Sequence, residues 1–165
     1  MAPYYMNQGF TIQNRCFPWG TTLAEVAVAL PGSTERLAER DNQVELEYAG
    51  PQFIFGLRVM VARLRAPKRD EPVVHAYFGL TAPSNSLEPA NPDTWFQLLE
   101  VELGRPFYAT SYDFSVRYRR SLHIFSAAWH FESASLYFSV YSGLRTASDT
   151  PAAGLYLYQK VLTID

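Results

Sequence analysis

Residues 135–141 read Ser-Leu-Tyr-Phe-Ser-Val-Tyr, so apolar and polar side chains alternate along this stretch. A period of two is typical of a β-strand with one face in the core and the other toward water. We expect the inward-facing side chains to be Leu136, Phe138 and Val140. The residues expected on the opposite face are Tyr137, Ser139 and Tyr141.

The same alternation occurs elsewhere in the chain. In Leu155-Tyr156-Leu157-Tyr158 both tyrosines are expected to face outward, and Val44-Glu45-Leu46-Glu47-Tyr48 predicts a strand with one wet face. Gly50-Pro51 is a turn signal, and residues 53–64 are predicted to form the next strand. Further strands are predicted for residues 73–80, 115–119, 123–131, 135–141 and 155–164.

A first helix is predicted for residues 21–30, because apolar residues recur there with helical spacing. Thr21 or Thr22 can cap its N-terminus, and Pro31-Gly32 ends it. A short helical extension is expected around residues 33–40. The apolar stripe consists of Leu23, Val26, Ala27 and Leu30.

A second helix is predicted for residues 91–103. Asn91 can serve as its N-cap, and Pro92 takes the first helical position, where its missing N–H costs nothing. Gly104 offers a left-handed C-cap, and Pro106 prevents the helix from continuing.

Runs of strands with only two helices predict an α+β fold, in which two main helices pack on one face of an antiparallel β-sheet. The chain is expected to form a single domain, residues 1–165. The order of a helix followed by a meander of strands occurs twice, which is compatible with two tandem halves, 10–80 and 91–165. Within these halves, residues 74–80 are similar to residues 138–144.

Composition excludes several classes of protein. The chain has 165 residues, of which 48% are hydrophobic and 15% aromatic, and this excludes a disordered chain. A formal net charge of -2 disfavours nucleic-acid binding, and the single cysteine, Cys16, excludes an internal disulfide framework. Neither a secretory leader nor an apolar run long enough for a membrane span is visible, so we expect a soluble cytoplasmic protein without a membrane partner.

No motif indicates a chemical reaction. Cys16 lies outside any nucleophile signature, and the chain has neither a G-x-S-x-G elbow nor a glycine-rich phosphate loop. His123 and His130 share a predicted strand at an odd spacing, which places them on opposite faces and argues against a shared metal ion. We therefore expect no catalytic residue, no metal and no cofactor.

Two groups of residues are candidates for partner binding. Glu45 and Glu47 share one strand face, which is expected to be solvated or to face a partner. If the strands at 135–141 and 155–164 pair, their tyrosines form an aromatic platform beside Ser139, a surface suited to protein recognition. The alternative is that a helix or the other half of the chain covers this face. The platform residues are Tyr137, Ser139, Tyr141, Tyr156 and Tyr158.

Residues 17–26, Phe-Pro-Trp-Gly-Thr-Thr-Leu-Ala-Glu-Val, resemble the strand, Trp-Gly-Thr and helix opening of small cytosolic bacterial immunity proteins. The segment from Trp129 to Arg145 is similar to the closing strands of such proteins, and the tandem layout is similar to that of the β-lactamase inhibitory protein family. The resemblance implies an inhibitor that occludes the active site of a cognate bacterial toxin, such as a type VI secretion effector. It assigns no functional residue position by position.

Two other interpretations remain open. The chain could be a small enzyme or ligand-binding domain with a pocket between helix and sheet, in which His123 or His130 lies beside Glu45, Glu47 or Asp113. It could also be an assembly subunit that associates through an unpaired edge strand. For the leading interpretation, the negative charge and the Glu45/Glu47 face suit a basic toxin cleft. The oligomeric state does not follow from the sequence.

Overall fold

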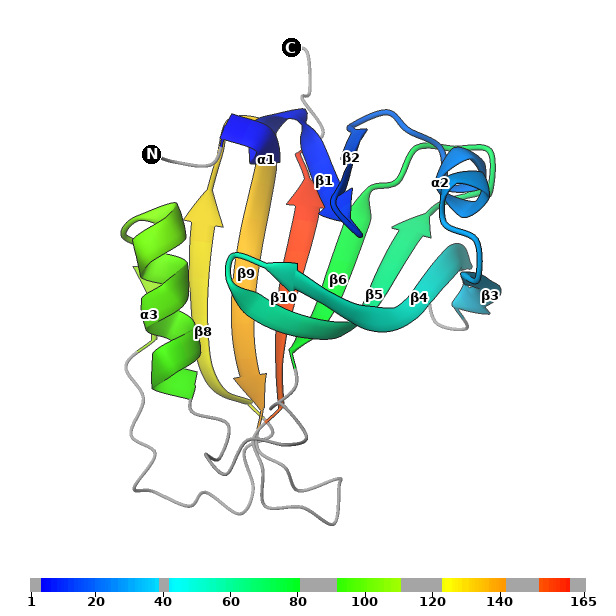
Figure 1. Ribbon diagram of the computed structural model, residues 1–165. Helices are drawn as coiled ribbons and strands as arrows, with labels where there is room; N and C mark the ends of the chain where they lie inside the picture. The colour runs from blue at the N-terminus through cyan, green and yellow to red at the C-terminus, as the bar shows by residue number, and fades with distance from the viewer. Residues whose placement is uncertain (1–3, 39–41, 81–91, 111–122, 142–151, 161–165) are drawn as a thin grey trace.

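The computed structural model describes residues 4–38, 42–80, 92–110, 123–141 and 152–160 (Figure 1). Their largest unit is an eight-stranded antiparallel sheet of order β3-β4-β5-β6-β10-β9-β8-β7, and β1 and β2 form a separate hairpin. The helices are α1 (Tyr4–Gln8), α2 (Leu23–Ala29) and α3 (Pro92–Leu103). The strands are β1 (Gly9–Ile12), β2 (Arg15–Pro18), β3 (Thr34–Ala38), β4 (Gln43–Ile54), β5 (Leu57–Ala66), β6 (His75–Leu80), β7 (Tyr108–Ala109), β8 (His123–His130), β9 (Ala134–Tyr141) and β10 (Ala152–Gln159).

The order of a helix followed by four strands occurs twice, as α2 with β3 to β6 and as α3 with β7 to β10. The last strands of the two runs, β6 and β10, pair with each other at the centre of the sheet. The strand equivalent to β6 is therefore β10, whereas the similarity between residues 74–80 and 138–144 matches β6 with β9. An internal duplication stays a prediction.

One face of the sheet is covered, and its side chains form the core. Alternate residues of the central strands are buried there, including the expected set on β9, and so are Phe10 and Phe17 of the β1–β2 hairpin. Figure 1 places α1, β1 and α3 in front of this face. The fold is thus α+β, but the expectation that two main helices cover one face is not supported, because α2 has only seven residues and the β1–β2 hairpin contributes to the cover.

The start of α2 and the end of α3 lie where local chemistry predicts. Thr22 is the N-cap of α2 and forms a capping box with Glu25: the Thr22 side chain accepts from the Glu25 backbone N–H, and the Glu25 carboxylate accepts from that of Thr22. After α3, Gly104 has a φ of 78°, and its carbonyl accepts a hydrogen bond from the Trp129 indole. Asn91 lies outside the described residues. Within the described segments, each helix is too short or too polar to cross a bilayer.

Two predicted boundaries are wrong. The turn expected at Gly50-Pro51 is a bulge within β4, and the hairpin turns at Phe55-Gly56, where both φ values are positive (54° and 74°). Such a pair is typical of a type I′ hairpin turn, which is why the chain reverses there. Residues 34–38 form β3 rather than a helical extension, because they gain backbone pairing along the edge of β4.

Candidate functional site: the exposed face of the sheet

The face of the sheet opposite to the core carries polar and aromatic side chains in two rows that cross the strands. The first row, from β5 to β9, consists of Arg63, Tyr77, Tyr156 and Tyr137. The second row, from β5 to β8, consists of Arg65, His75, Tyr158, Ser135 and His130. Residues paired directly across neighbouring strands have Cβ atoms about 5 Å apart, so the side chains of each row are neighbours on this face.

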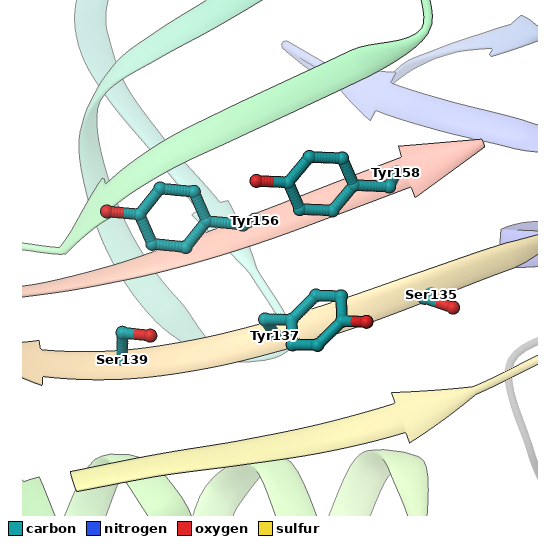
Figure 2. A pocket seen from close by; sticks show the side chains of 5 residues that line it. All are labelled: Ser135, Tyr137, Ser139, Tyr156 and Tyr158. Atoms are coloured by element: carbon teal, nitrogen blue, oxygen red, sulfur yellow. The ribbon is translucent and has the colours of Figure 1, made fainter. Parts of the chain in front are cut away.

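An open hollow of about 430 Å³ lies over β9 and β10 (Figure 2). The Tyr137 and Tyr158 rings meet edge to face, with centroids 5.6 Å apart and an interplanar angle of 82°. This geometry is favourable for aromatic pairs, and it holds the two rings in place although they are 38% and 40% exposed. The residues that line the hollow are Ser135, Tyr137, Ser139, Tyr156 and Tyr158.

Small residues form the base of the surface beside the hollow. Ser139 pairs with Gly154 of β10, and Gly154 pairs with Gly79 of β6. The ring of Tyr77 lies directly on Gly154, since a Cβ atom placed there would come within 2.5 Å of Tyr77 Cε2. Tyr77 also packs against Tyr156, with ring centroids 4.9 Å apart. The missing side chain at Gly154 therefore lets the aromatic surface extend from the hollow onto β6.

Beside the tyrosines, the sheet carries a network of five charged side chains from β3, β4 and β5. Glu45 accepts hydrogen bonds from Arg36 Nε and Arg65 Nε, each at 2.7 Å. Glu47 accepts from Arg36 Nη2 at 2.8 Å and from Arg63 Nε at 2.7 Å. Among the described residues, three guanidinium groups are thus bound to two carboxylates, and these five side chains have a combined formal charge of +1.

Glu45 does not face solvent, which corrects the expectation for this residue. Its side chain is 3% exposed and that of Glu47 is 27% exposed, because cross-strand pairing sets Arg36 and Arg65 on either side of Glu45. Burial raises the pKa of the Glu45 carboxyl, but the hydrogen bonds from Arg65 and Arg36 and the positive charges of these two residues together lower it by more, so that the net pKa is below its ordinary value. A role of either glutamate in partner binding stays a prediction.

The difference in burial predicts unequal effects of removing the two charges. Glu45→Gln is expected to lower the free energy of unfolding by about 1.5 kcal/mol, below the full cost of breaking a buried ion pair, since its arginine partners reach water. Glu47→Gln, the matched control on the same strand face, is expected to cost less than about 0.5 kcal/mol. Urea denaturation at pH 7 measures both values. Equal losses would contradict the greater dependence of the fold on the buried carboxylate of Glu45.

His75 occupies the junction between the charged network and the tyrosines. It pairs with Arg65 on one side and with Tyr158 on the other, and its ring stacks on Tyr158 at 4.4 Å with an interplanar angle of 10°. Its Nε2 atom is buried and has no hydrogen-bond partner among the described residues. Burial and the Arg65 guanidinium together lower the pKa of His75 to about 4, although Glu45 acts in the opposite direction. His75 is therefore neutral at pH 7.

His130 and Cys16 show no catalytic arrangement with the described side chains. Nδ1 of His130 lies 3.0 Å from the Ser135 hydroxyl, and Cys16 is an exposed free thiol on β2. Nowhere in the described segments do three or more His, Cys, Asp or Glu side chains gather as they would around a metal ion. The side chain of His123 and the whole of Asp113 lie outside the described residues.

The structure brings together four of the five predicted platform residues, Tyr137, Ser139, Tyr156 and Tyr158, through the direct pairing of β9 with β10. Tyr141 ends β9, but its side chain lies outside the described residues. Sequence reasoning missed Tyr77 and His75, although their alternation with buried neighbours in β6 is visible in the sequence. Compared with protein-family models, curated proteins and solved structures, the chain matches none.

Proposed function

We propose that this chain is a non-enzymatic binding protein whose exposed sheet face docks on a partner protein. Its proposed class is the one that the sequence resembles, a cytoplasmic immunity protein that occludes the active site of a bacterial toxin. The observation that carries the proposal is the hollow over β9 and β10, where two tyrosines are 38% and 40% exposed yet fixed by mutual packing.

Tyrosine and arginine are the residue types most suited to such a surface. Tyrosine contributes a large contact area at a small loss of conformational entropy, and both types are enriched among the residues that dominate binding energy. Here Tyr77 of β6 pairs with Tyr156 of β10. The Arg63 guanidinium lies over the Tyr77 ring, 5.7 Å from the ring centroid. A partner that covers this band would meet ordered side chains and would lose little free energy in immobilising them.

The hollow does not support the alternative of a small enzyme with a pocket between helix and sheet. It lies on the face of β9 and β10 opposite to Leu136, Phe138 and Leu155, which are fully buried in the core. It also opens widely and is formed by hydroxyl and aromatic groups of neighbouring strands (Figure 2). A shallow, open and amphipathic surface of this kind suits a protein partner.

Removing a tyrosine of the hollow is expected to weaken partner binding about tenfold or more, because the ring fills the centre of the proposed contact. The variants are Tyr137→Ala and Tyr156→Ala, and the matched control is Phe53→Ala, which removes an aromatic ring that is 70% exposed on β4. Titration calorimetry with the captured partner measures the affinities. Unchanged affinity in both tyrosine variants, with folding intact, would show that the hollow is not part of the binding interface.

The immunity function needs a separate measurement. The full chain is used to capture a partner from cells that encode it, and the captured protein is then assayed for toxicity with and without the chain. We expect wild-type chain to abolish toxicity on co-expression and Tyr137→Ala to restore it in part. A partner that binds tightly but remains toxic would support docking on this face and would overturn the inhibitory role.

A further inference from the structure

The charged network exposes its arginines to solvent, whereas the sequence predicts a face on which Glu45 and Glu47 are exposed. Its two carboxylates are 3% and 27% exposed, whereas the side chains of Arg36, Arg63 and Arg65 are 48%, 39% and 32% exposed. The carboxylates lie beneath the guanidinium groups that bind them, so the outer layer of the network is basic. A surface of this sign attracts an acidic group and disfavours a basic cleft.

Arg63 is the member of this layer that is best placed to bind a further anion. Its Nε donates to Glu47 at 2.7 Å, and its guanidinium lies over the Tyr77 ring, 5.7 Å from the centroid. Within the segments that the structure describes, no hydrogen bond engages its Nη1 or Nη2 atoms. One edge of the planar group therefore holds it in position, and the other edge presents two N–H donors in the geometry that a carboxylate accepts.

Arg63 is also close enough to the hollow for one partner segment to contact both. It lies in the same cross-strand row as Tyr77 and Tyr156. Two strand spacings separate β5 from β10, a distance of about 10 Å. About three extended residues of a partner span such a distance.

We propose that the partner presents an acidic segment, in which one carboxylate binds Nη1 and Nη2 of Arg63 while a neighbouring aromatic or apolar side chain enters the tyrosine hollow. This inference rests on the proposed function, because it specifies the chemistry of the partner at the same face. It replaces the basic toxin cleft expected from the sequence with an acidic contact surface. Arg63 is then the residue that determines charge specificity, and the tyrosines supply most of the contact area.

Labelled peptides test the charge preference directly, whatever the identity of the partner. Three peptides share one central tryptophan and differ in its flanks, which are Asp/Glu, Asn/Gln or Lys. Fluorescence anisotropy measures their binding to the full-length chain and to the variants Arg63→Gln and Arg58→Gln. Arg58 is the matched control, since it lies on the same strand β5 and pairs with Phe53 near the hairpin turn.

We expect wild-type chain to bind the acidic peptide at least about tenfold more tightly than the Asn/Gln peptide, the usual effect of one charged hydrogen-bonded pair. Arg63→Gln should abolish this preference, and Arg58→Gln should keep it. Glu47→Gln provides a second, independent readout: the glutamine amide oxygen can still accept from Arg63 Nε, but the negative charge beside the site is lost, and the acidic peptide should then bind a few-fold more tightly. Circular dichroism of each variant checks that it is folded.

Each contrary outcome has a distinct meaning. Equal binding of the three peptides, weakened in each case by Tyr137→Ala, would overturn the acidic preference and leave the proposed function standing. Preferential binding of the lysine peptide, or no binding of the acidic one at millimolar concentration, would also overturn the inference. Tighter binding of a single-stranded oligonucleotide than of the acidic peptide would assign the arginines to phosphate instead. Peptide binding unaffected by Tyr137→Ala would contradict the proposed function itself.

Discussion

Phe138→Ala is expected to lower the free energy of unfolding by about 4 kcal/mol, because truncating a fully buried phenylalanine loses its transfer free energy and leaves a cavity. Phe138 is 0% exposed at the centre of β9. Its ring packs against Phe125 of β8, with centroids 5.9 Å apart, and faces Phe96 of α3 at 6.5 Å. The variant would therefore disrupt the contact between α3 and the sheet as well as the core itself.

The neighbouring residue on the same strand provides the control. Tyr137→Ala is expected to cost less than about 1 kcal/mol, because Tyr137 is 38% exposed and points to the other face. Urea denaturation followed by circular dichroism gives both values. A large loss for Tyr137→Ala would mean that its ring belongs to the core. The same variant could then not be used to test partner binding.

This contrast between neighbouring residues could be predicted from the sequence, because the faces of a strand follow from alternation alone. Leu136, Phe138 and Val140 are all 0% exposed, as their apolar character predicts. The helix starting after Thr22 and the helix ending before Gly104 could also be predicted, since caps and left-handed glycines act locally. Each of these predictions depends on residues that are near one another in the chain.

What the sequence does not reveal is pairing between distant strands. The burial of Glu45 depends on Arg36 of β3 and Arg65 of β5. The registers of these two strands with β4 are set only in the folded structure. Alternation places Glu45 on the face opposite to Leu46 but does not tell that two guanidinium groups lie against it. The same limit explains why the link between Tyr77 and Tyr156 is missed, since β6 and β10 are far apart in the chain and meet only in the folded sheet.

The position of the β4–β5 turn illustrates a competition between local signals. Gly50-Pro51 is a stronger turn signal than Phe55-Gly56, yet the chain passes it as a bulge and continues to Ile54. Extending the hairpin buries Phe55, Leu57 and Val59, which are 8%, 2% and 0% exposed. The hydrophobic gain from this extension outweighs the local preference for a turn at the proline.

His75 gives the second large expected effect, a loss of about 2 kcal/mol of stability between pH 7 and pH 5. Its pKa is about 4 in the folded chain and has its ordinary value of 6.5 when unfolded. Between these values the unfolded chain binds the proton more readily, so acidification favours unfolding. The stabilising contribution is complete above pH 6.5 and is lost as the pH falls toward 4.

The physical cause lies in the surroundings of the ring. Protonation would place a charge beside the Arg65 guanidinium and against the stacked Tyr158 ring, where little water can solvate it. Glu45 offers only partial compensation, because its two oxygens already bind Arg36 and Arg65. The carboxyl of Glu45 also contributes to acid sensitivity, but its pKa is lowered from 4.5, so its effect falls below the pH range of the His75 effect.

His75→Phe separates the titration from the packing, since phenylalanine keeps the stack on Tyr158 and removes the ionisable nitrogen. We expect the variant to be at least as stable as wild type and to lose the stability change between pH 7 and pH 5. Urea denaturation across this range tests the slope, and an NMR titration of the His75 ring tests its pKa directly. A ring pKa near 6.5, or an unchanged slope in His75→Phe, would show that the site is open to water. The junction between the arginines and the tyrosines would then lack the ordered packing that the proposed docking face requires.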